Sequence, residues 1–461
     1  MAGVTGAVQY AQAQQAESLG QLEDLLRIPS VSTLPENQPD IARAAEWVAD
    51  CLKRLDFERV EILPTARHPM VCGEWLGAGP DKPTVLVYGH YDVQPSDPDD
   101  LWNSPAFEPT IRGDNLFARG ASDMKGQLVA FLRATEALKA NEGLPVNLRF
   151  LIEGEEEVGS PNMLPFVQQE RNRLQADICL NLDAGILAPD VPAITYTLRG
   201  LAYFEIRLEA AKGDQHSGTF GGAIDNPAQV LAHLIAGMKD RDGKILLPGF
   251  YDKVRPLTPE DRADLAQLPQ NEAWWKEQAG VAHLFGEPEY TPTERATARP
   301  TLEVNGLLSG FTGEGSKTVL PARAMAKISC RLVPDQDPAE ITESMRQYLT
   351  DNAPNTVTWE LLTHANAPPG IVERESPAIS AAQAAFEAVW GRSAVFSRQG
   401  GTVPVVGYVK QELGMDSLLL GFGLPDDNLH APNEKLHLPS FYRGIQVYIH
   451  FLDEYGRAGA G

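Results

Sequence analysis

The sequence has few cysteines and no long run of apolar residues. Its four cysteines lie far apart, and none forms a C-x-x-C pair: Cys51, Cys72, Cys179 and Cys330. This pattern excludes a disulfide-rich scaffold and favours free thiols in a reducing compartment. No apolar run approaches the roughly 18 residues of a membrane-spanning helix, and residues 1–16 lack the charged and apolar regions of a signal peptide. We therefore expect a cytoplasmic protein that does not enter a membrane.

Positive charge is also scarce. The chain carries 39 Lys and Arg residues against 62 Asp and Glu residues, for a formal net charge of -23. Nucleic acids and anionic membranes need basic surfaces, so the composition argues against both as partners. The 461 residues, 43% of them hydrophobic, are enough for two or three domains with substantial cores.

The first part of the chain alternates between predicted strands and helices. Apolar runs at 84–88, 146–152 and 178–182 predict buried strands, and apolar residues at helical spacing predict helices at 42–55 and from Ser122 onward. This alternation indicates an α/β fold with a doubly wound, mostly parallel sheet.

The pattern changes near residue 198. Apolar and polar residues alternate over 201–208, which predicts a strand with one exposed face, and a further strand and helix follow at 325–332 and 338–349. Residues 240–300 are predicted to be irregular. We therefore predict a second, α+β domain at 198–364, inserted into a first domain that comprises residues 1–197 and 365–461.

Polar residues gather at the ends of the predicted strands and in the loops that follow. The candidates are His90, Asp123, Glu157, Asp183 and His430. Each alone has an ordinary structural interpretation, such as a helix cap, a solvated charge run or a surface histidine. Together, two imidazoles and three carboxylates suit zinc or a similar divalent ion, and one carboxylate can bridge two ions. An extra Glu in the run Glu155–Glu157 could then act as a general base.

Asp92 has a predicted supporting role. In an extended segment residues i and i+2 point the same way. The Asp92 carboxylate is therefore predicted to hydrogen-bond the ring nitrogen of His90 that does not face the metal, which would fix the tautomer.

Five motifs follow one another along nearly the whole chain: Gly89–Pro95, Arg119–Gly126, Glu153–Ser160, the strand end at Asp183 and the loop with His430. In these motifs and their order the chain resembles the M20 metallopeptidases, in particular the branch of cytosolic nonspecific dipeptidases and carnosinases. The resemblance implies a two-domain metallohydrolase with two divalent ions per subunit, zinc first and manganese as the alternative. The catalytic metal-binding domain would comprise residues 1–197 and 365–461, and the inserted domain at 198–364 would be a lid and dimerisation domain.

The resemblance also implies a role for each residue of the metal site. Asp123 would bridge the two ions, with His90 and Asp183 completing one site and Glu157 and His430 the other. Glu156 would be the general base, and Glu155 an extra acid outside the site. Met124 stands where the family often has a second acid, after a peptide bond that is typically cis.

The inserted domain carries further motifs of the family. Asp214–Gly218 is similar to a lid motif in which the histidine, here His216, reaches the partner subunit's active site and steadies the oxyanion, which implies a homodimer. Arg331 and the loop with Gly401 and Thr402 would bind the substrate's C-terminal carboxylate, and Thr318 could be contributed in trans.

These features predict two-metal-dependent hydrolysis of dipeptides and other small peptides, with a metal-bridging water as nucleophile and Glu156 as base. The alternative within the family is an N-acyl amino acid deacylase or desuccinylase, because no residue is identified that receives the substrate's free amine. A non-catalytic metal-binding protein is a remote alternative, and Glu156 argues against it because a structural site needs no base.

Overall fold

The computed structural model describes residues 4–401 and 403–458, which form two compact units. Unit 1 contains the chain up to Tyr196, the stretch Ile371–Ser397 and the chain from Tyr408 onward. Unit 2 contains Thr197–Gly370 and Arg398–Gly407. Among the described residues, none of the helices is both long and apolar enough to cross a membrane.

Unit 1 is built on a mixed sheet whose strands follow the order β1-β2-β6-β3-β7-β17-β8-β15, with β16 also paired to β8. Its central pairs, β6 with β3, β3 with β7 and β7 with β17, are parallel, and its outer pairs β1 with β2 and β2 with β6 are antiparallel. The strands are β1 (Glu58–Leu63), β2 (Met70–Trp75), β3 (Thr84–His90), β6 (Asn147–Glu153), β7 (Ile178–Asn181), β8 (Ala193–Leu198), β15 (Gly370–Ile371), β16 (Val395–Gln399) and β17 (Ser417–Leu419).

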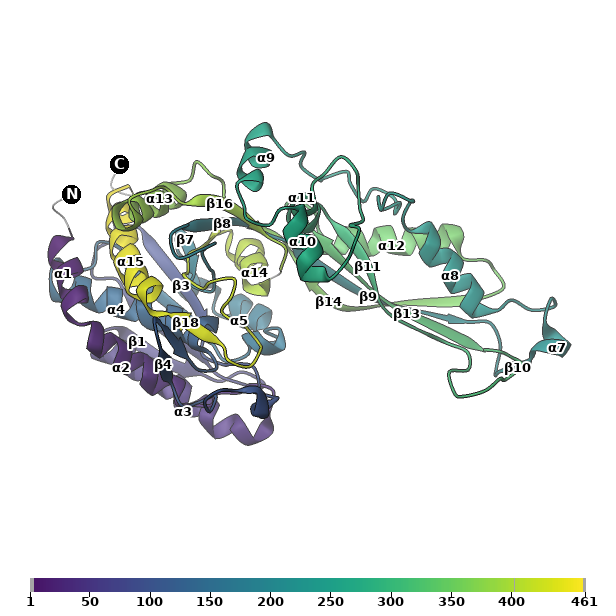
Figure 1. Cartoon of the computed structure of the whole chain (residues 1–461), viewed down its shortest axis with the longest axis horizontal. Helices are drawn as coiled ribbons and strands as arrows, with labels where there is room; N and C mark the ends of the chain where they lie inside the picture. The colour runs from purple at the N-terminus through teal and green to yellow at the C-terminus, as the bar shows by residue number, and fades with distance from the viewer. Residues whose placement is uncertain (1–3, 402, 459–461) are drawn as a thin grey trace. The chain divides into compact units, whose positions relative to one another are not determined.

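Helices cover this sheet because its strands are apolar on both faces. Val85 and Val87 of β3 join the main core, whereas the equally buried Leu86 between them points to the opposite face. Figure 1 shows α4, α13 and α15 gathered on one side of the sheet. The helices are α1 (Thr5–Ala13), α2 (Gln15–Leu26), α3 (Gln38–Arg54), α4 (Gly126–Ala140), α5 (Met163–Gln169), α6 (Arg171–Leu174), α13 (Pro377–Trp390), α14 (Pro404–Leu413) and α15 (Leu438–Ala458). The predicted doubly wound α/β fold is confirmed.

A second, small sheet in unit 1 brings two distant loops together. It has the order β18-β5-β4, formed by β4 (Thr110–Arg112), β5 (Asn115–Phe117) and β18 (Lys435–His437). Strand β5 leads into the segment of Asp123, and β18 follows the segment of His430. Their antiparallel pairing, with Leu436 opposite Leu116, therefore places those two segments side by side.

Unit 2 is an antiparallel sheet of the order β11-β13-β9-β14 with helices on one face. Alternate residues of β9 and β13, such as Phe204 and Ile328, pack against α8 and α12 in a separate core. The strands are β9 (Gly200–Glu209), β11 (Thr301–Ser309), β13 (Arg323–Leu332) and β14 (Thr358–Ala367), and the helices are α8 (Pro227–Gly237) and α12 (Pro338–Asn352). Unit 2 also contains a short strand pair, β10 (Gln215–His216) with β12 (Val319–Leu320), and helix α7 (Ser217–Phe220).

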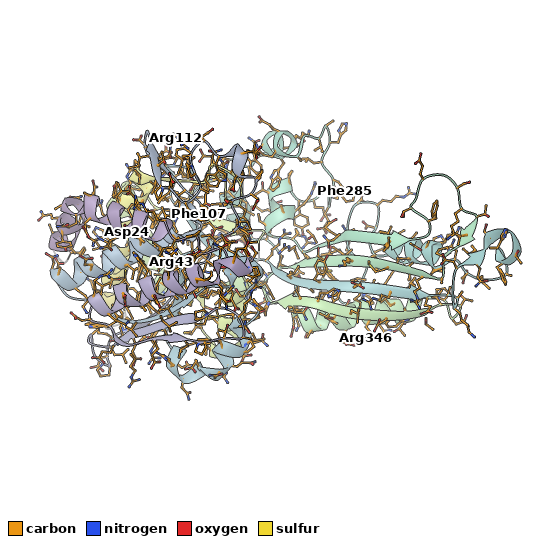
Figure 2. All side chains as sticks on the ribbon, turned by 90° about the horizontal axis from the view of Figure 1, so that it is seen from below. Asp24, Arg43, Phe107, Arg112, Phe285 and Arg346 are labelled. Carbon is orange, nitrogen blue, oxygen red and sulfur yellow. The ribbon has the colours of Figure 1, made fainter. Side chains whose placement is uncertain are left out.

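The prediction that residues 240–300 are irregular was wrong in part. This segment contains three short helices, α9 (Pro259–Ala266), α10 (Glu272–Ala279) and α11 (Pro292–Thr297). Capping boxes begin two of them, from Thr258 to Asp261 and from Thr291 to Glu294. None of these helices is longer than eight residues, which is too short for a clear apolar periodicity. Phe285, which Figure 2 labels, is 68% exposed between them.

Candidate active site

The candidate metal ligands of unit 1 lie at one edge of its sheet. His90 ends β3, Glu157 belongs to the short turn η4 (Glu156–Val158) after β6, and Asp183 follows β7 by two residues. Because β6, β3 and β7 are neighbouring parallel strands, their carboxyl ends meet at the same edge. Asp123 and His430 reach this edge through the loops that the small sheet joins.

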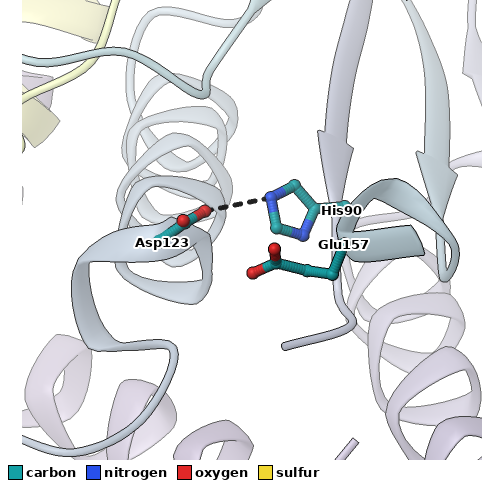
Figure 3. Close-up of side chains that lie close together, drawn as sticks. All are labelled: His90, Asp123 and Glu157. Atoms are coloured by element: carbon teal, nitrogen blue, oxygen red, sulfur yellow. Dashed lines mark ion pairs between the residues drawn. The ribbon is translucent and has the colours of Figure 1, made fainter. Parts of the chain in front are cut away.

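Three of these residues form a compact group. The ligand atoms of His90, Asp123 and Glu157 all lie within 4.8 Å of one another (Figure 3). His90 Nε2 is 3.2 Å from Asp123 Oδ1, yet this buried nitrogen makes no hydrogen bond among the described residues. The other ring nitrogen, Nδ1, is 3.0 Å from the backbone carbonyl of Asp92. When Nδ1 donates there, Nε2 keeps its lone pair for a cation, so this donor set fits a divalent metal ion.

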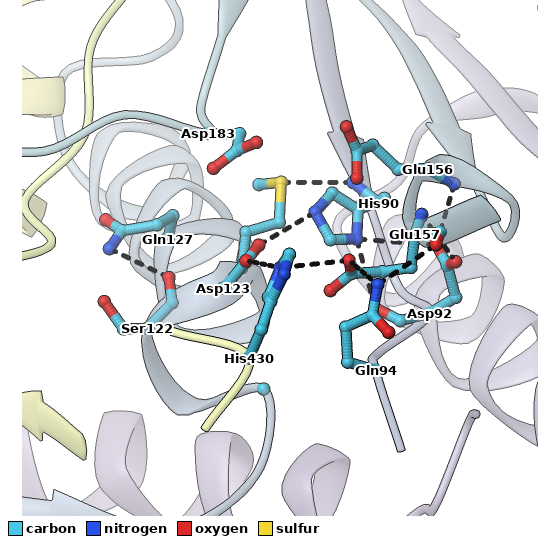
Figure 4. A network of polar contacts seen from close by, with 12 residues as sticks. His90, Asp92, Gln94, Ser122, Asp123, Gln127, Glu156, Glu157, Asp183 and His430 are labelled. Atoms are coloured by element: carbon cyan, nitrogen blue, oxygen red, sulfur yellow. Dashed lines mark hydrogen bonds and ion pairs between the residues drawn. The ribbon is translucent and has the colours of Figure 1, made fainter. Parts of the chain in front are cut away.

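The Asp123 carboxylate lies between two imidazoles. One of its oxygens faces His90, and the other, Oδ2, is 2.9 Å from His430 Nε2. His430 Nε2 is also 3.1 Å from Glu157 Oε2 (Figure 4). Each Asp123 oxygen therefore faces a different imidazole, an arrangement that is compatible with a carboxylate between two ions.

Asp183 lies outside the compact group but faces the same space (Figure 4). Burial and then the Asp123 charge raise the pKa of Asp183 to about 7. Burial would also raise the pKa of Asp123, but His430 and His90 outweigh it and hold that pKa well below the usual range. The structure therefore brings the five predicted ligands around one charged centre.

Glu156 and Glu155 have different surroundings although they are adjacent. Burial, followed by the nearby charge of Asp183, raises the pKa of Glu156 well above its usual value. Glu155 instead accepts hydrogen bonds from the backbone N–H of His68 at 2.6 Å and from Asn162 Nδ2 on both oxygens, at 2.9 and 2.8 Å. Its carboxylate is thus used in holding neighbouring loops.

The expected hydrogen bond from His90 to the Asp92 carboxylate was wrong in detail. Asp92 Oδ1 lies 3.4 Å from His90 Nδ1, and the shorter contact is to the Asp92 carbonyl. The carboxylate instead accepts the backbone N–H groups of Glu156 at 3.2 Å and Glu157 at 3.1 Å. Asp92 therefore orients His90 through its backbone and the Glu156–Glu157 turn through its side chain.

Met124 packs directly beneath the site. The Asp123–Met124 peptide bond is cis. Met124 Sδ lies 3.1 Å from the backbone nitrogen of His90, and a Cβ added at Gly89 would come within 2.8 Å of Met124 Cε. Glycine at position 89 thus makes room for the methionine.

Sequence reasoning missed several residues that hold the site. Gln94 Nε2 donates to Glu157 Oε2 at 2.9 Å and to the Glu157 carbonyl at 3.1 Å. Gln94 could have been predicted, because the i, i+2 spacing of His90 and Asp92 continues to position 94. Glu434 and Arg119 form a buried ion pair at 2.7 Å in the loops of His430 and Asp123, for which spacing gave no signal.

In unit 2, His216 and Thr318 are neighbours. Strand β10 pairs His216 with Val319, and the backbone N–H of Ser217 donates to the Thr318 carbonyl at 3.1 Å. His216 Nδ1 accepts the backbone N–H of Gly218 at 3.0 Å, so Nε2 carries the ring proton. The exposed imidazole can therefore act as a hydrogen-bond donor.

A cationic pair lies near the glycine loop of unit 2. Burial and the charge of Arg331 lower the pKa of Arg199 to about 10. Arg199 Nε donates to the Gly400 carbonyl at 2.9 Å, so this second arginine, which sequence reasoning missed, orients the loop that continues to Gly401. Thr402, also predicted to bind substrate, lies outside the described residues.

An open α/β sheet with imidazoles and carboxylates around one central carboxylate is typical of metal-dependent hydrolases. The chain belongs to Peptidase family M20/M25/M40, which it matches over residues 86–454. The predicted family is thus confirmed, and with it an enzyme that hydrolyses peptide bonds.

Similar proteins span almost the full chain. Cys-Gly metallodipeptidase DUG1 of Candida albicans is 34% identical over 95% of this chain and 94% of its own length. Human Beta-Ala-His dipeptidase is 30% identical over 97% and 91%, respectively. Among solved structures, the M20 family metallo-carboxypeptidase Sso-CP2 from Sulfolobus solfataricus is similar with a TM-score of 0.83 and 33% identity, covering 96% of this chain and 99% of that one.

The site predicts that metal binding releases protons. Hydrogen bonds to Asp123 and Glu157 raise the pKa of His430 to about 10, and the carboxylates of Asp123 and Asp92 overcome burial to raise the pKa of His90 well above its usual value. Without metal, these raised pKa values favour a second ring proton on each imidazole, and a metal ion must displace that proton before Nε2 can offer its lone pair. We expect the affinity for Zn²⁺ to increase from pH of about 6 to about 8.

Calorimetric titration of metal-free protein in two buffers of different ionisation enthalpy measures the protons released. The control variant His283→Ala, at an exposed position, should release as many as the wild type, whereas His430→Ala should release about one fewer. Equal heats in both buffers, together with a pH-independent affinity, would contradict this electrostatic account.

Proposed function

We propose that this protein is a two-metal dipeptidase that hydrolyses the peptide bond of unmodified dipeptides and other small peptides. The observation that carries the proposal is the Asp123 carboxylate, which faces His90 with one oxygen and His430 with the other. The names of two similar proteins, a Cys-Gly metallodipeptidase and a Beta-Ala-His dipeptidase, support dipeptides as the substrate class.

In this proposal Asp123 would be shared by two divalent ions. His90 and Asp183 would hold one ion, and Glu157 and His430 would hold the other. Zinc is the first candidate because imidazole and carboxylate ligands suit it, and manganese is the alternative. When bound, the ions polarise the scissile carbonyl and lower the pKa of a bound water.

Glu156 supplies the proton transfer. Its carboxylate is partly buried beside the cluster, and its raised pKa favours holding a proton once it has taken one from the attacking water. The same oxygen then gives that proton to the leaving amine nitrogen. Asp92 supports this step because it holds the backbone of Glu156.

Unit 2 supplies the groups that recognise the rest of the substrate. His216 carries its proton on Nε2 and can donate it to the oxyanion that develops on the scissile carbonyl. Arg331, with Gly401 and Thr402, is assigned to the substrate's C-terminal carboxylate, because a guanidinium matches a carboxylate in two parallel hydrogen bonds. Thr318 lies beside His216 and acts with it.

The proposal includes a homodimer in which His216 serves the partner subunit's site. Strand β11 is an outer strand of the unit 2 sheet, and its Leu307 and Leu308 are 62% and 57% exposed. An apolar outer strand of this kind is a liability in a monomer and suits burial against a second chain.

Two rival activities use the same metal site. The similarity to a metallo-carboxypeptidase favours longer peptides, and an N-acyl amino acid deacylase would accept a substrate whose amine is acylated and not free.

A panel of free dipeptides, matched N-acetylated dipeptides and tripeptides separates these activities. We expect metal-reconstituted enzyme to cleave the free dipeptides with the highest kcat/KM. Preferential cleavage of the acetylated set or of the tripeptides would overturn the dipeptidase assignment.

The base is tested in the same assay. Glu156→Gln should lower kcat by about 10²-fold or more while metal content stays unchanged, because a positioned base contributes about 10²–10⁴-fold. Glu36→Gln, at an exposed position, is the matched control and should keep full activity. A Glu156→Gln enzyme that is as active as the control would refute the assignment.

Mixed dimers test the action of His216 across the interface. His90→Ala and His216→Ala subunits should each be inactive alone, since one lacks a ligand and the other the oxyanion donor. A mixed dimer contains one site with both residues intact, so each mixed dimer should have up to about half the activity of a wild-type dimer, which has two such sites. No recovery, with mixed dimers verified by native mass spectrometry, would show that His216 does not act in trans.

A further inference from the structure

Two acidic residues flank His430 in sequence and are completely buried. Asp427 and Glu434 each have 0% of their surface exposed, three residues before and four residues after the histidine. Neither belongs to the candidate ligand set. Buried carboxylates are stable only when hydrogen bonds or charges compensate them, so their partners show what they hold.

Glu434 binds the backbone of the Asp123 segment. Its Oε1 accepts the N–H groups of Ser122 at 3.0 Å and Asp123 at 3.1 Å. Its Oε2 accepts the N–H of Gly120 at 2.9 Å and Arg119 Nη1 at 2.7 Å. A single carboxylate thus receives four donors from five consecutive residues, which is how backbone N–H groups bind an anion.

Arg119 extends this contact to the other loops of the site. Its Nη2 donates to the carbonyl of Pro95 at 3.0 Å and lies 3.4 Å from the carbonyl of Ala431. Pro95 follows the His90 motif, and Ala431 follows His430 directly. The Glu434–Arg119 pair therefore contacts all three segments that carry His90, Asp123 and His430.

Asp427, which precedes His430 in the sequence, also binds the Asp123 segment. Its Oδ2 accepts Ser122 Oγ at 2.6 Å and the backbone N–H of Leu424 at 2.7 Å, and its Oδ1 pairs with Lys435 Nζ at 3.0 Å. The loop of His430 is thereby held to the Asp123 segment at both ends.

We propose that Glu434 is a positioning residue of the metal centre, which orients Asp123 against His430 before any ion binds. The inference rests on the proposed metal site and adds a residue that acts on it through Asp123. Partners that orient metal ligands affect metal affinity because they remove the cost of ordering the ligands. Glu434 would do so for the carboxylate that both ions share.

The test compares metal affinity in Glu434→Gln and in a matched control. Glutamine keeps the shape but presents an NH₂ group to backbone donors, so one side of the contact becomes repulsive. Asp426→Asn removes an acid from the same loop, at a side chain that is 77% exposed. In competition with a chromophoric chelator, we expect Zn²⁺ affinity to fall about 10–100-fold in Glu434→Gln and to stay within about twofold of wild type in the control.

Unfolding midpoints in EDTA show whether Glu434→Gln is folded. A folded variant with unchanged Zn²⁺ affinity would overturn the proposal.

Hydrogen exchange of the metal-free wild type tests the same claim without a variant. If Glu434 orders the segment in advance, the peptide 119–124 should exchange slowly in EDTA, compared with the exposed loop 312–317. Exchange as fast as in that loop, slowing only after Zn²⁺ is added, would assign the order to the ion and overturn the proposal. A wild type that binds no Zn²⁺ would instead refute the proposed function. The exchange result would still show whether the segment 119–124 is ordered without an ion, as the role of Glu434 requires.

Discussion

Asp123, Glu157 and Asp183 bring three carboxylates into one largely buried space at the edge of the unit 1 sheet, with Glu156 beside them. Like charges this close cannot all persist without compensation. The carboxyl pKa values therefore shift in opposite directions. Two imidazoles lower the pKa of Asp123, whereas burial and nearby carboxylates raise the pKa values of Asp183 and Glu156. Bound cations satisfy this constraint for all of them at once, and the chemistry proposed here follows from it.

The same repulsion has to be resisted by the backbone. The order of the parallel strands alone places His90, Glu157 and Asp183 at one edge of the sheet. Asp123 and His430 come from loops and need dedicated partners. Asp92 and Gln94 hold the turn of Glu157, and Glu434 does the same for Asp123. Acidic and amide side chains that are not candidate ligands thus orient the residues that are.

Much of the fold could be predicted because its central strands are apolar runs with polar residues at their ends. The family was evident from motifs in the right order, but the individual roles of the site residues remain predictions that rest on resemblance and geometry. Spacing could place Asp92 on the same side as His90, but it could not tell the carbonyl from the carboxylate as the partner of the ring. The helices after Thr258 and Thr291 were missed, although Thr291 and Glu294 have capping-box spacing.

Glu434 illustrates a deeper limit of sequence reasoning. Three of its four donors are backbone N–H groups some three hundred residues away in sequence, and backbone donors cannot be recognised from residue types. Only the pairing of β5 with β18 explains why position 434 meets the Asp123 segment. Arg199 is a similar case, since it acts through the Gly400 carbonyl.

Anomalous X-ray scattering from crystals of the Zn²⁺-reconstituted protein, measured on both sides of the zinc absorption edge, tests the central claim most directly. The account predicts two zinc peaks per subunit, on either side of the Asp123 carboxylate and about 3.5–4 Å apart, as in two-metal hydrolases. One peak should contact His90 and Asp183, and the other Glu157 and His430. A single peak, or two peaks that do not share Asp123, would contradict it.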